Sequence, residues 1–220
     1  MALLDEKQIK KIEAAIKVAE ENTSCEIVPV LASSSNQYMH ASYLFGFCIS
    51  LISYLLYIGL APYIPAEHWH GLTQFQYHLI AIGIMIFTFI LGAVTSQYVP
   101  ALKLPFLSKD EMKLQARRRA RQAYFDFCRG RTTGDTGIII YVSLFEHIVL
   151  VLGDNAVAKK IEQAEWDSIK DVMLEHLKKG SLDDAFTDGI LKTGNYVKDK
   201  MPSSGTNENQ LVNEIKFITD

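Results

Sequence analysis

The sequence predicts an α/β fold in which a small mixed sheet is sandwiched by helices and interrupted by a two-helix transmembrane hairpin. The first observation is the charge distribution: the 220 residues include 22 Lys or Arg and 25 Asp or Glu, yet Glu67 is the one charged residue between Ile27 and Leu102. The second is a pair of apolar segments in that region, each about 20 residues long. The third is the alternation of helix-like and strand-like segments on both sides of it. This pattern excludes both a uniform globular domain and a disordered chain.

The two apolar segments, Tyr43–Ala61 and Tyr77–Tyr98, have the length needed to cross about 30 Å of hydrocarbon. Their interiors contain no Asp, Glu, Lys or Arg, and tyrosines stand near their ends, where aromatic rings anchor at the interface. In the alternative, a soluble protein with a buried hairpin, this short chain would have to cover two helices that are apolar on every face. We therefore expect a transmembrane hairpin at residues 41–100 with a short outer loop at 62–76.

The basic residues predict the orientation of this hairpin. Four lysines precede the first segment, nine basic residues lie between Lys103 and Arg131, and the loop has no Lys or Arg. By the positive-inside rule, both termini are expected in the cytoplasm and the protein in the cell (inner) membrane. The first 26 residues are highly charged, which argues against a cleavable signal peptide. The three cysteines are too few for a disulfide framework or a zinc site.

The cytoplasmic domain is expected to be discontinuous, formed by residues 1–36 and 106–220. Asp5–Glu21 has the apolar spacing of an amphipathic helix, and Cys25–Leu31 has the composition of a strand. Pro29 predicts that this strand lies at a sheet edge or bends. Because one helix and one strand cannot bury a core, they must pack on the part that follows the hairpin.

The segment after the hairpin alternates helices and strands. We expect a helix at Ser108–Arg129, two strands at Gly137–Val142 and His147–Leu152 joined as a hairpin, and two further helices at Ala156–Lys179 and Asp183–Lys200. The first of these strands is apolar throughout, which indicates a strand covered on both faces.

One stretch of this segment carries a resemblance. The sequence RARQAYFDFCRGRTTGDTGIIIYVSLFEHIVLVLGD (Arg119–Asp154), with Trp166, Lys178–Gly180 and Lys200–Pro202, resembles the TPM domain, a family named for thylakoid lumen, photosystem and receptor accessory proteins. The chain is similar to the bacterial subgroup in which two membrane helices interrupt the domain. The resemblance implies an α/β sandwich around a small twisted sheet, with acid phosphatase activity and calcium binding known among relatives.

A carboxylate cluster is the main candidate metal site. If the strand hairpin turns between Leu144 and Phe145, then Asp135 and Asp154 face each other at its open end. Parallel pairing of the first strand would bring Glu26 to the same edge. Carboxylates that share an edge repel one another, and Ca²⁺ or Mg²⁺ would relieve the repulsion. The alternative is a solvated loop edge with turn-forming aspartates.

The basic helix has two interpretations. Its arginines dock on anionic lipid, or they pair with the acidic half of the domain. The lipid-surface assignment covers Arg117, Arg118, Arg119 and Arg121. Nucleic acid is excluded as a partner because no groove-reading motif accompanies the charge. Arg129 and Arg131 border a glycine-flanked, hydroxyl-rich segment and are candidates for binding phosphate.

These observations favour an accessory, assembly or quality-control factor at the cytoplasmic membrane face, with a membrane-protein partner that the sequence does not identify. The alternative is a metal-dependent phosphatase in which Asp135 and Asp154 hold the ion and Arg129 or Arg131 binds phosphate. Catalytic residues stay unassigned, since the sequence has no P-loop, nucleophile elbow or kinase motif. Two helices without an intramembrane charge provide no transport pathway.

Overall fold

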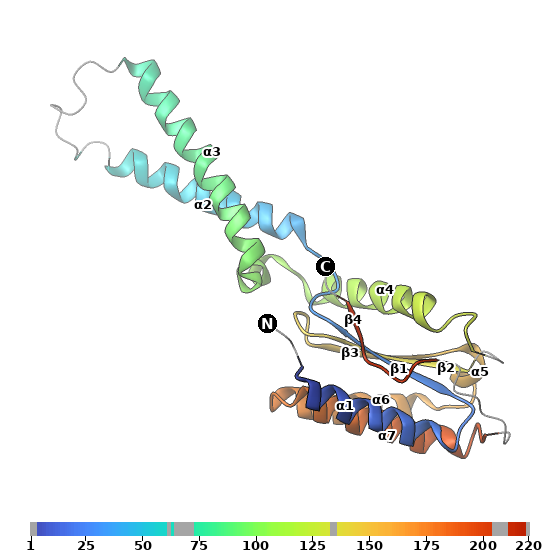
Figure 1. Ribbon diagram of the computed structural model, residues 1–220. Coiled ribbons are helices and arrows are strands. Elements are labelled where there is room, and N and C mark those ends of the chain that lie inside the picture. Colours follow the sequence, from blue (N-terminus) through green and yellow to red (C-terminus); the bar gives the residue numbers. More distant parts are fainter. Residues whose placement is uncertain (1–3, 61–62, 64–72, 133–135, 204–210, 219–220) are drawn as a thin grey trace. The chain divides into compact units, whose positions relative to one another are not determined.

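The chain forms two compact units, Met1–Asn36 with Met112–Asp220, and Gln37–Glu111 (Figure 1). The computed structural model describes residues 4–60, 63, 73–132, 136–203 and 211–218. The helices of the first unit are α1 (Glu6–Glu20), α4 (Lys109–Phe127, which begins just before the unit boundary), α5 (Asn155–Ala158), α6 (Gln163–Lys178) and α7 (Leu182–Lys198). Its strands are β1 (Glu26–Ala32), β2 (Gly137–Ser143), β3 (Ile148–Gly153) and β4 (Lys216–Ile218).

The four strands form one mixed sheet in the order β3-β2-β1-β4. β1 runs parallel to β2 and to β4, whereas β2 and β3 form an antiparallel hairpin. Glu26 pairs with Gly137 at one end of the β1–β2 ladder, and Ala32 pairs with Ser143 at the other. The predicted α/β fold with a small mixed sheet is confirmed, and strands from before and after the hairpin pair along their full length.

β1 lies inside the sheet, so the prediction that Pro29 marks an edge strand is wrong. The Glu26 N–H points to β2, where it donates to the Thr136 carbonyl at 3.3 Å. Successive N–H groups of a strand alternate between its two sides, so the Pro29 nitrogen points toward the β4 side. β4 pairs with β1 only from Val30 onward, and no ladder hydrogen bond is therefore lost at the proline.

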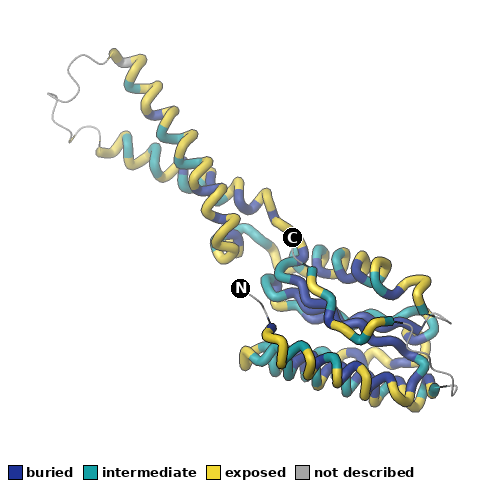
Figure 2. The backbone as a smooth tube through the Cα atoms, viewed as in Figure 1, coloured by how far each residue is buried: buried dark blue, intermediate teal, exposed yellow. Residues whose placement is uncertain are grey.

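Helices cover both faces of the sheet (Figure 1). α1, α6 and α7 pack on one face, where their apolar side chains form the larger core with the sheet, and α4 packs on the other through Ala120 and Ala123. Figure 2 shows the buried centre of the sheet, where β1 and β2 are buried along their full length. The larger core joins residues from both ends of the chain, including Ile12, Ile16, Ile190 and Val197. Residues 1–36 therefore complete a domain that is otherwise built after the hairpin.

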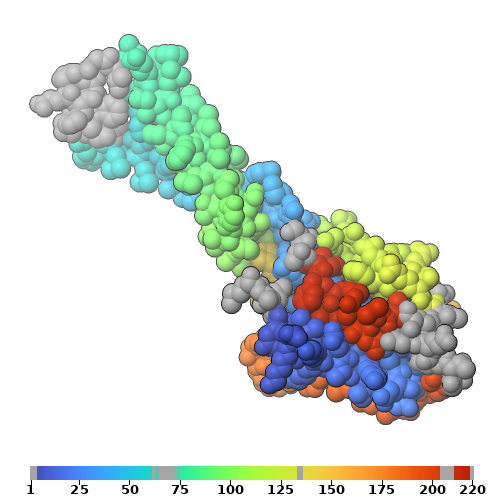
Figure 3. Space-filling view, in the orientation of Figure 1, coloured from blue at the N-terminus to red at the C-terminus, as the bar shows by residue number. Residues whose placement is uncertain are grey.

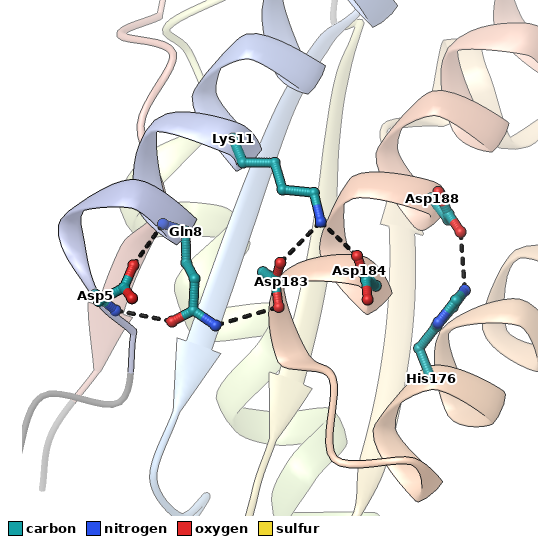
Figure 4. A network of polar contacts seen from close by, with 7 residues as sticks. All are labelled: Asp5, Gln8, Lys11, His176, Asp183, Asp184 and Asp188. Atoms are coloured by element: carbon teal, nitrogen blue, oxygen red, sulfur yellow. Dashed lines mark hydrogen bonds and ion pairs between the residues drawn. The ribbon is translucent and has the colours of Figure 1, made fainter.

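Polar contacts fasten α1 to α7 at the rim of that core (Figure 4). Lys11 Nζ forms ion pairs with Asp183, at 2.8 Å, and with Asp184. Gln8 Nε2 donates to the Asp183 carboxylate at 3.2 Å, and the Gln8 side chain also completes a capping box with Asp5 at the start of α1. The Lys11 ammonium lowers the pKa of Asp183, so this carboxylate is ionised at neutral pH.

The segment between β3 and α7 differs from the expected single helix. It contains the short helix α5 and then α6, which begins after Glu162. The Glu162 N–H donates to the Glu165 side chain at 2.8 Å, a local bond that starts a new helix there. The C-terminal segment adds the strand β4, which the sequence analysis did not predict. Figure 3 shows this segment in red at the surface of the first unit.

The second unit consists of α2 (Met39–Leu60), α3 (Gln74–Tyr98) and the 3₁₀ segment η3 (Pro100–Phe106). Both long helices are apolar enough to cross a membrane, and few of their residues are buried. They pack closely at Gly46, where a Cβ atom would lie 2.6 Å from the Phe89 carbonyl oxygen. Side-chain hydrogen bonds cross between them, including Ser50 Oγ to the Met85 carbonyl at 3.0 Å.

The two ends of this helical hairpin meet at its base. Lys103 Nζ donates to the Gln37 carbonyl at 2.8 Å, which joins η3 to the residues just before α2. The Lys103 side chain is largely buried, and this desolvation lowers its pKa. Phe45 and Phe106 add an edge-to-face contact with ring centroids 6.5 Å apart. The chain therefore leaves and re-enters the first unit through one connected base.

Candidate functional site

Two of the predicted carboxylates, Glu26 and Asp154, lie near the amino-terminal ends of β1 and β2. Glu26 begins β1 opposite Gly137, and the Asp154 N–H donates to the Gly137 carbonyl at 2.9 Å. Neighbouring strands lie about 4.8 Å apart, so the Glu26 and Asp154 backbones flank Gly137 at about 10 Å from each other. Glu26 is 2% exposed, whereas Asp154 is partly exposed and accepts a hydrogen bond from the Asn155 N–H at 2.7 Å.

The β2–β3 register differs from the expected one. Ile138 pairs with Gly153 and Ser143 with Ile148, so the turn is centred between Phe145 and Glu146, one residue later than predicted. The prediction that Asp154 faces Asp135 is therefore wrong, because Asp154 stands opposite Gly137. Asp135 and Thr133 lie outside the described residues. The later turn follows from Ser143, which remains in β2 and bonds through its hydroxyl to the Glu146 carboxylate.

Cys128 lies directly over this edge. A Cβ atom added to Gly137 would be 3.0 Å from Cys128 Cβ, so glycine is required for the helix end and the strand to approach. Burial, together with the nearby negative charge of Asp154, raises the pKa of the Cys128 thiol to about 12. The thiol is therefore protonated at neutral pH, as expected of a packed side chain and not of a nucleophile.

A second buried acid, Glu20, lies beside Glu26. Glu20 Oε1 accepts the Ile27 N–H at 2.6 Å, on the β4 side of β1 but before the stretch of β1 that pairs with β4. Burial raises the pKa of Glu20 to about 8; the Ile27 hydrogen bond opposes this shift and the Glu26 charge adds to it. Sequence reasoning missed Glu20, although its position four residues after Ile16 continues the apolar stripe of α1.

Residues of the C-terminal segment contact this acidic pair. The Leu211 N–H donates to Glu26 Oε2 at 3.4 Å, and the Asn213 side chain hydrogen-bonds to Glu20. The carboxyl pair therefore joins α1, β1 and the segment that leads into β4.

No group of three or more His, Cys, Asp or Glu side chains that could hold a metal ion occurs within residues 4–60, 63, 73–132, 136–203 and 211–218. Glu26 and Asp154 each accept a hydrogen bond from a backbone N–H, of Leu211 and of Asn155 respectively. The predicted Ca²⁺ or Mg²⁺ site therefore depends on Asp135, and it stays a prediction.

Arg131 lines a surface pocket of about 230 Å³ on the α4 face of the sheet. Val28 and Phe127 form its apolar wall, and Lys216 of β4 adds a second positive charge. Arg129 is directed elsewhere: its guanidinium carbon lies 4.7 Å from the centroid of the Phe125 ring, a cation–π contact. Of the two arginines predicted to bind phosphate, Arg131 borders this pocket and Arg129 stacks on Phe125.

The four arginines assigned to a lipid surface divide into two groups. Arg117, Arg118 and Arg121 are exposed on α4, while Arg119 is half-buried. Arg119 Nη1 donates to Gln122 Oε1 at 3.1 Å. Burial raises the pKa of Tyr141, and the Arg119 charge lies close enough to that phenol to oppose part of the rise. Arg119 is therefore directed toward the domain, and three arginines supply the exposed positive charge.

A buried polar network lies at the carboxyl ends of β1 and β2, and the sequence analysis did not predict it. Glu146 accepts hydrogen bonds from the Ser143 hydroxyl and, at 2.9 Å, from the Ser35 N–H. The Ser35 hydroxyl lies 3.0 Å from both the Ser143 and the Tyr141 hydroxyls. This network connects the β2–β3 turn to the residues that leave β1 for the helical hairpin. Its only sequence signal was that Ser143 and Glu146 belong to the family-like stretch.

Comparison with known proteins agrees with this architecture. Residues 110–196, from the start of α4 to the last turns of α7, match the family model described as the TPM domain. The NMR structure of the BA42 protein from the psychrophilic bacterium Bizionia argentinensis sp. nov. is similar with a TM-score of 0.59 and 16% identity, over 99% of this chain and 97% of that one. At this identity the likeness shows the fold alone. The comparison with curated proteins found no match.

Proposed function

We propose, from the match of residues 110–196 to the TPM domain model, that the chain is a membrane-anchored accessory factor, acting in the assembly or quality control of a membrane protein at the cytoplasmic face. The observation that carries the proposal is the pairing of β1, which precedes the helical hairpin, with β2, which follows it. Both ends of the hairpin therefore return to one domain. A pair of spanning helices meets this condition, because the chain crosses out and back.

The surface of the hairpin supports membrane insertion. Large apolar side chains such as Phe47, Leu55 and Phe87 are more than half exposed on α2 and α3. In water this surface would be a strong aggregation site, and in lipid it is the expected one. The basic residues on either side of the hairpin favour a cytoplasmic domain, and Arg117, Arg118 and Arg121 supply positive charge for contact with anionic lipid.

The topology is tested with single cysteines in a background in which the three native cysteines are replaced. Tyr63→Cys reports the loop and Lys198→Cys reports the domain, since both positions are exposed. With a maleimide that does not cross the bilayer, we expect labelling of Tyr63→Cys in intact cells and of Lys198→Cys only after lysis. The reverse pattern would overturn the orientation, and extraction of the chain by alkaline carbonate would overturn membrane insertion.

The thiols support a binding role over covalent catalysis. Burial raises the pKa of Cys25 to about 11 and that of Cys128 to about 12, so neither thiol is an activated nucleophile. The accessory role is tested by photocrosslinking in native membranes from exposed domain positions. We expect one or a few membrane proteins to be captured reproducibly; capture of no membrane protein from any face of the domain would contradict it.

The second candidate is a metal-dependent phosphatase, and one observation favours it: the Arg131 pocket carries two positive charges near buried Glu26. Arg131 and Lys216 would bind the phosphate, while Asp135, Asp154 and Glu26 would hold a divalent cation that stabilises charge on the phosphoryl oxygens. The full chain in detergent is assayed on p-nitrophenyl phosphate with Ca²⁺, Mg²⁺ or EDTA. Activity that Asp135→Asn/Asp154→Asn or Arg131→Met leaves intact would remove this assignment, and the absence of activity would leave the accessory role.

A further inference from the structure

The two edges of the sheet differ in how they are protected against pairing with another chain. At the β4 edge the strand has three residues and carries Lys216, and the open part of β1 beside it is occupied by Pro29 and by the Glu20 side chain, which takes up the Ile27 N–H. Short strands, prolines and charges are the usual protection of sheet edges. β3, at the other edge, reads IVLVLG and has no charge and no proline. An apolar edge of this kind is suited to accept an added strand.

One hydrogen bond shows which backbone groups of β3 point toward β2 and which point away from the sheet. The Asp154 N–H donates to β2 at Gly137, so in the antiparallel ladder Leu152 and Leu150 also direct their backbone groups to β2. Val151 and Val149 therefore direct theirs away from the sheet. Val149 is 5% exposed and Val151 is half-buried, so the accessible outer edge is centred on Val151.

A groove of about 230 Å³ runs beside this edge, between α4 and α6. Its apolar lining includes Ile148, Leu150 and Leu174. Its polar lining is basic, with Lys113 and Arg117 from α4 and His147 from the β2–β3 turn. No acidic residue lines it within the described parts of the chain.

The basic lining of the groove disfavours a second copy of this chain and favours an acidic partner. In a second copy of this chain paired through β3, the two α4 helices would lie on the same side of the joined sheet, with Lys113 and Arg117 facing their own counterparts. Like charges placed opposite each other disfavour that arrangement. An extended segment with Asp or Glu beside its apolar residues meets the groove with opposite charge, and its backbone can pair with β3.

We propose that β3 and this groove form the docking site for a short acidic, extended segment of a partner protein, which adds to the sheet as a fifth strand. The inference rests on the proposed accessory function and specifies the chemistry of its partner. The acidic side chains of the segment pair with Lys113 and Arg117, and its apolar residues cover Leu150 and Leu174.

The test is a titration of the purified full chain, in neutral detergent micelles, with a fluorescent peptide that alternates Val and Glu. We expect saturable binding and slower hydrogen exchange at the Val151 amide. The Lys113→Glu/Arg117→Glu variant is expected to bind about tenfold more weakly, the loss typical of two exposed charge pairs. The matched control Arg118→Glu/Arg121→Glu changes the same charge on α4 outside the groove and is expected to bind as the native chain does.

Several outcomes would overturn the proposal. Equal loss in the two variants would mean unspecific attraction to a basic helix. Undiminished binding of a peptide N-methylated at alternate residues, or unchanged exchange at Val151, would rule out strand addition. Binding of phosphatidylserine to the chain that Lys113→Glu/Arg117→Glu abolishes, with no binding of the peptide, would make the groove a lipid contact. Because the titration needs no membrane partner, its failure beside successful crosslinking would reject the docking site alone, and the converse result would reject the accessory role.

Discussion

Replacement of Glu20 by Gln is expected to remove the loss of stability that alkaline pH causes in the first unit. The unfolded carboxyl loses its proton above its ordinary pKa of 4.5, while the folded one keeps it until about 8. Stability is therefore complete below pH 4.5 and falls as the pH rises toward 8. The shift of about 3.5 units corresponds to a ceiling of about 5 kcal/mol at 1.36 kcal/mol per unit. Gln has no charge to desolvate, and its carbonyl can still accept the Ile27 N–H.

The assay is urea unfolding of the full chain in detergent at pH 5 and pH 9, followed by the fluorescence of Trp166, which lies in the larger core. Trp69 is replaced by Phe in all variants so that Trp166 is the single reporter. At pH 5 the Glu20→Gln variant and the parent should differ by no more than about 1 kcal/mol, and at pH 9 the variant should be the more stable by up to about 5 kcal/mol.

The control is Glu21→Gln, an exposed neighbour on the same helix end, which should leave the pH dependence unchanged. A Glu20→Gln variant that is less stable than the parent at pH 9, or equally displaced from it at both pH values, would refute the reasoning. Either result would mean that the carboxylate is solvated or specifically stabilised in the folded chain.

Three further predictions concern other parts of the chain. Cys25 and Cys128, whose pKa values burial raises to about 11 and about 12, should react with maleimide at pH 7 only after unfolding, as mass spectrometry can show; rapid native labelling would contradict this. Gly46→Leu should weaken hairpin packing by about 1–3 kcal/mol in detergent melting, whereas Gly59→Leu, where a Cβ meets no atom within 4 Å, should not. Glu146→Ala should lower the free energy of unfolding by about 1–3 kcal/mol and speed amide exchange at Ser35. Unchanged exchange would mean that the hydrogen-bond network around Glu146 does not hold this segment in place.

Local patterns in the sequence predicted much of the fold. Apolar spacing located α1, α4 and α7 to within about two residues, as is usual for helix boundaries, and composition located β1, β2 and β3. The parallel β1–β2 pairing followed from the long connection between these strands. β4 escaped prediction because three residues carry too little alternation to be distinguished from a loop.

The details of the site depended on information that is not local. Pro29 looked like an edge residue because the sequence does not say that β4 pairs only beyond it. The β2–β3 register was wrong by one residue in the turn, since the bond from Ser143 to Glu146 holds the turn in place and such side-chain bonds are visible only in three dimensions. The burial of Glu20 and Glu26 also depends on tertiary packing, because an isolated α1 would leave Glu20 in water.

The central position of β1 has a consequence for biosynthesis. β1 ends at Ala32, and the strand that pairs with it begins at Gly137, about a hundred residues later. At roughly 5–20 residues per second, the ribosome takes on the order of ten seconds to supply that partner. During this interval the nascent chain holds an apolar strand with no neighbour while α2 and α3 are being made. If the helical hairpin inserts into a bilayer as proposed, the domain matures only after insertion, and chains whose helices fail to insert would be clients for chaperones and proteases.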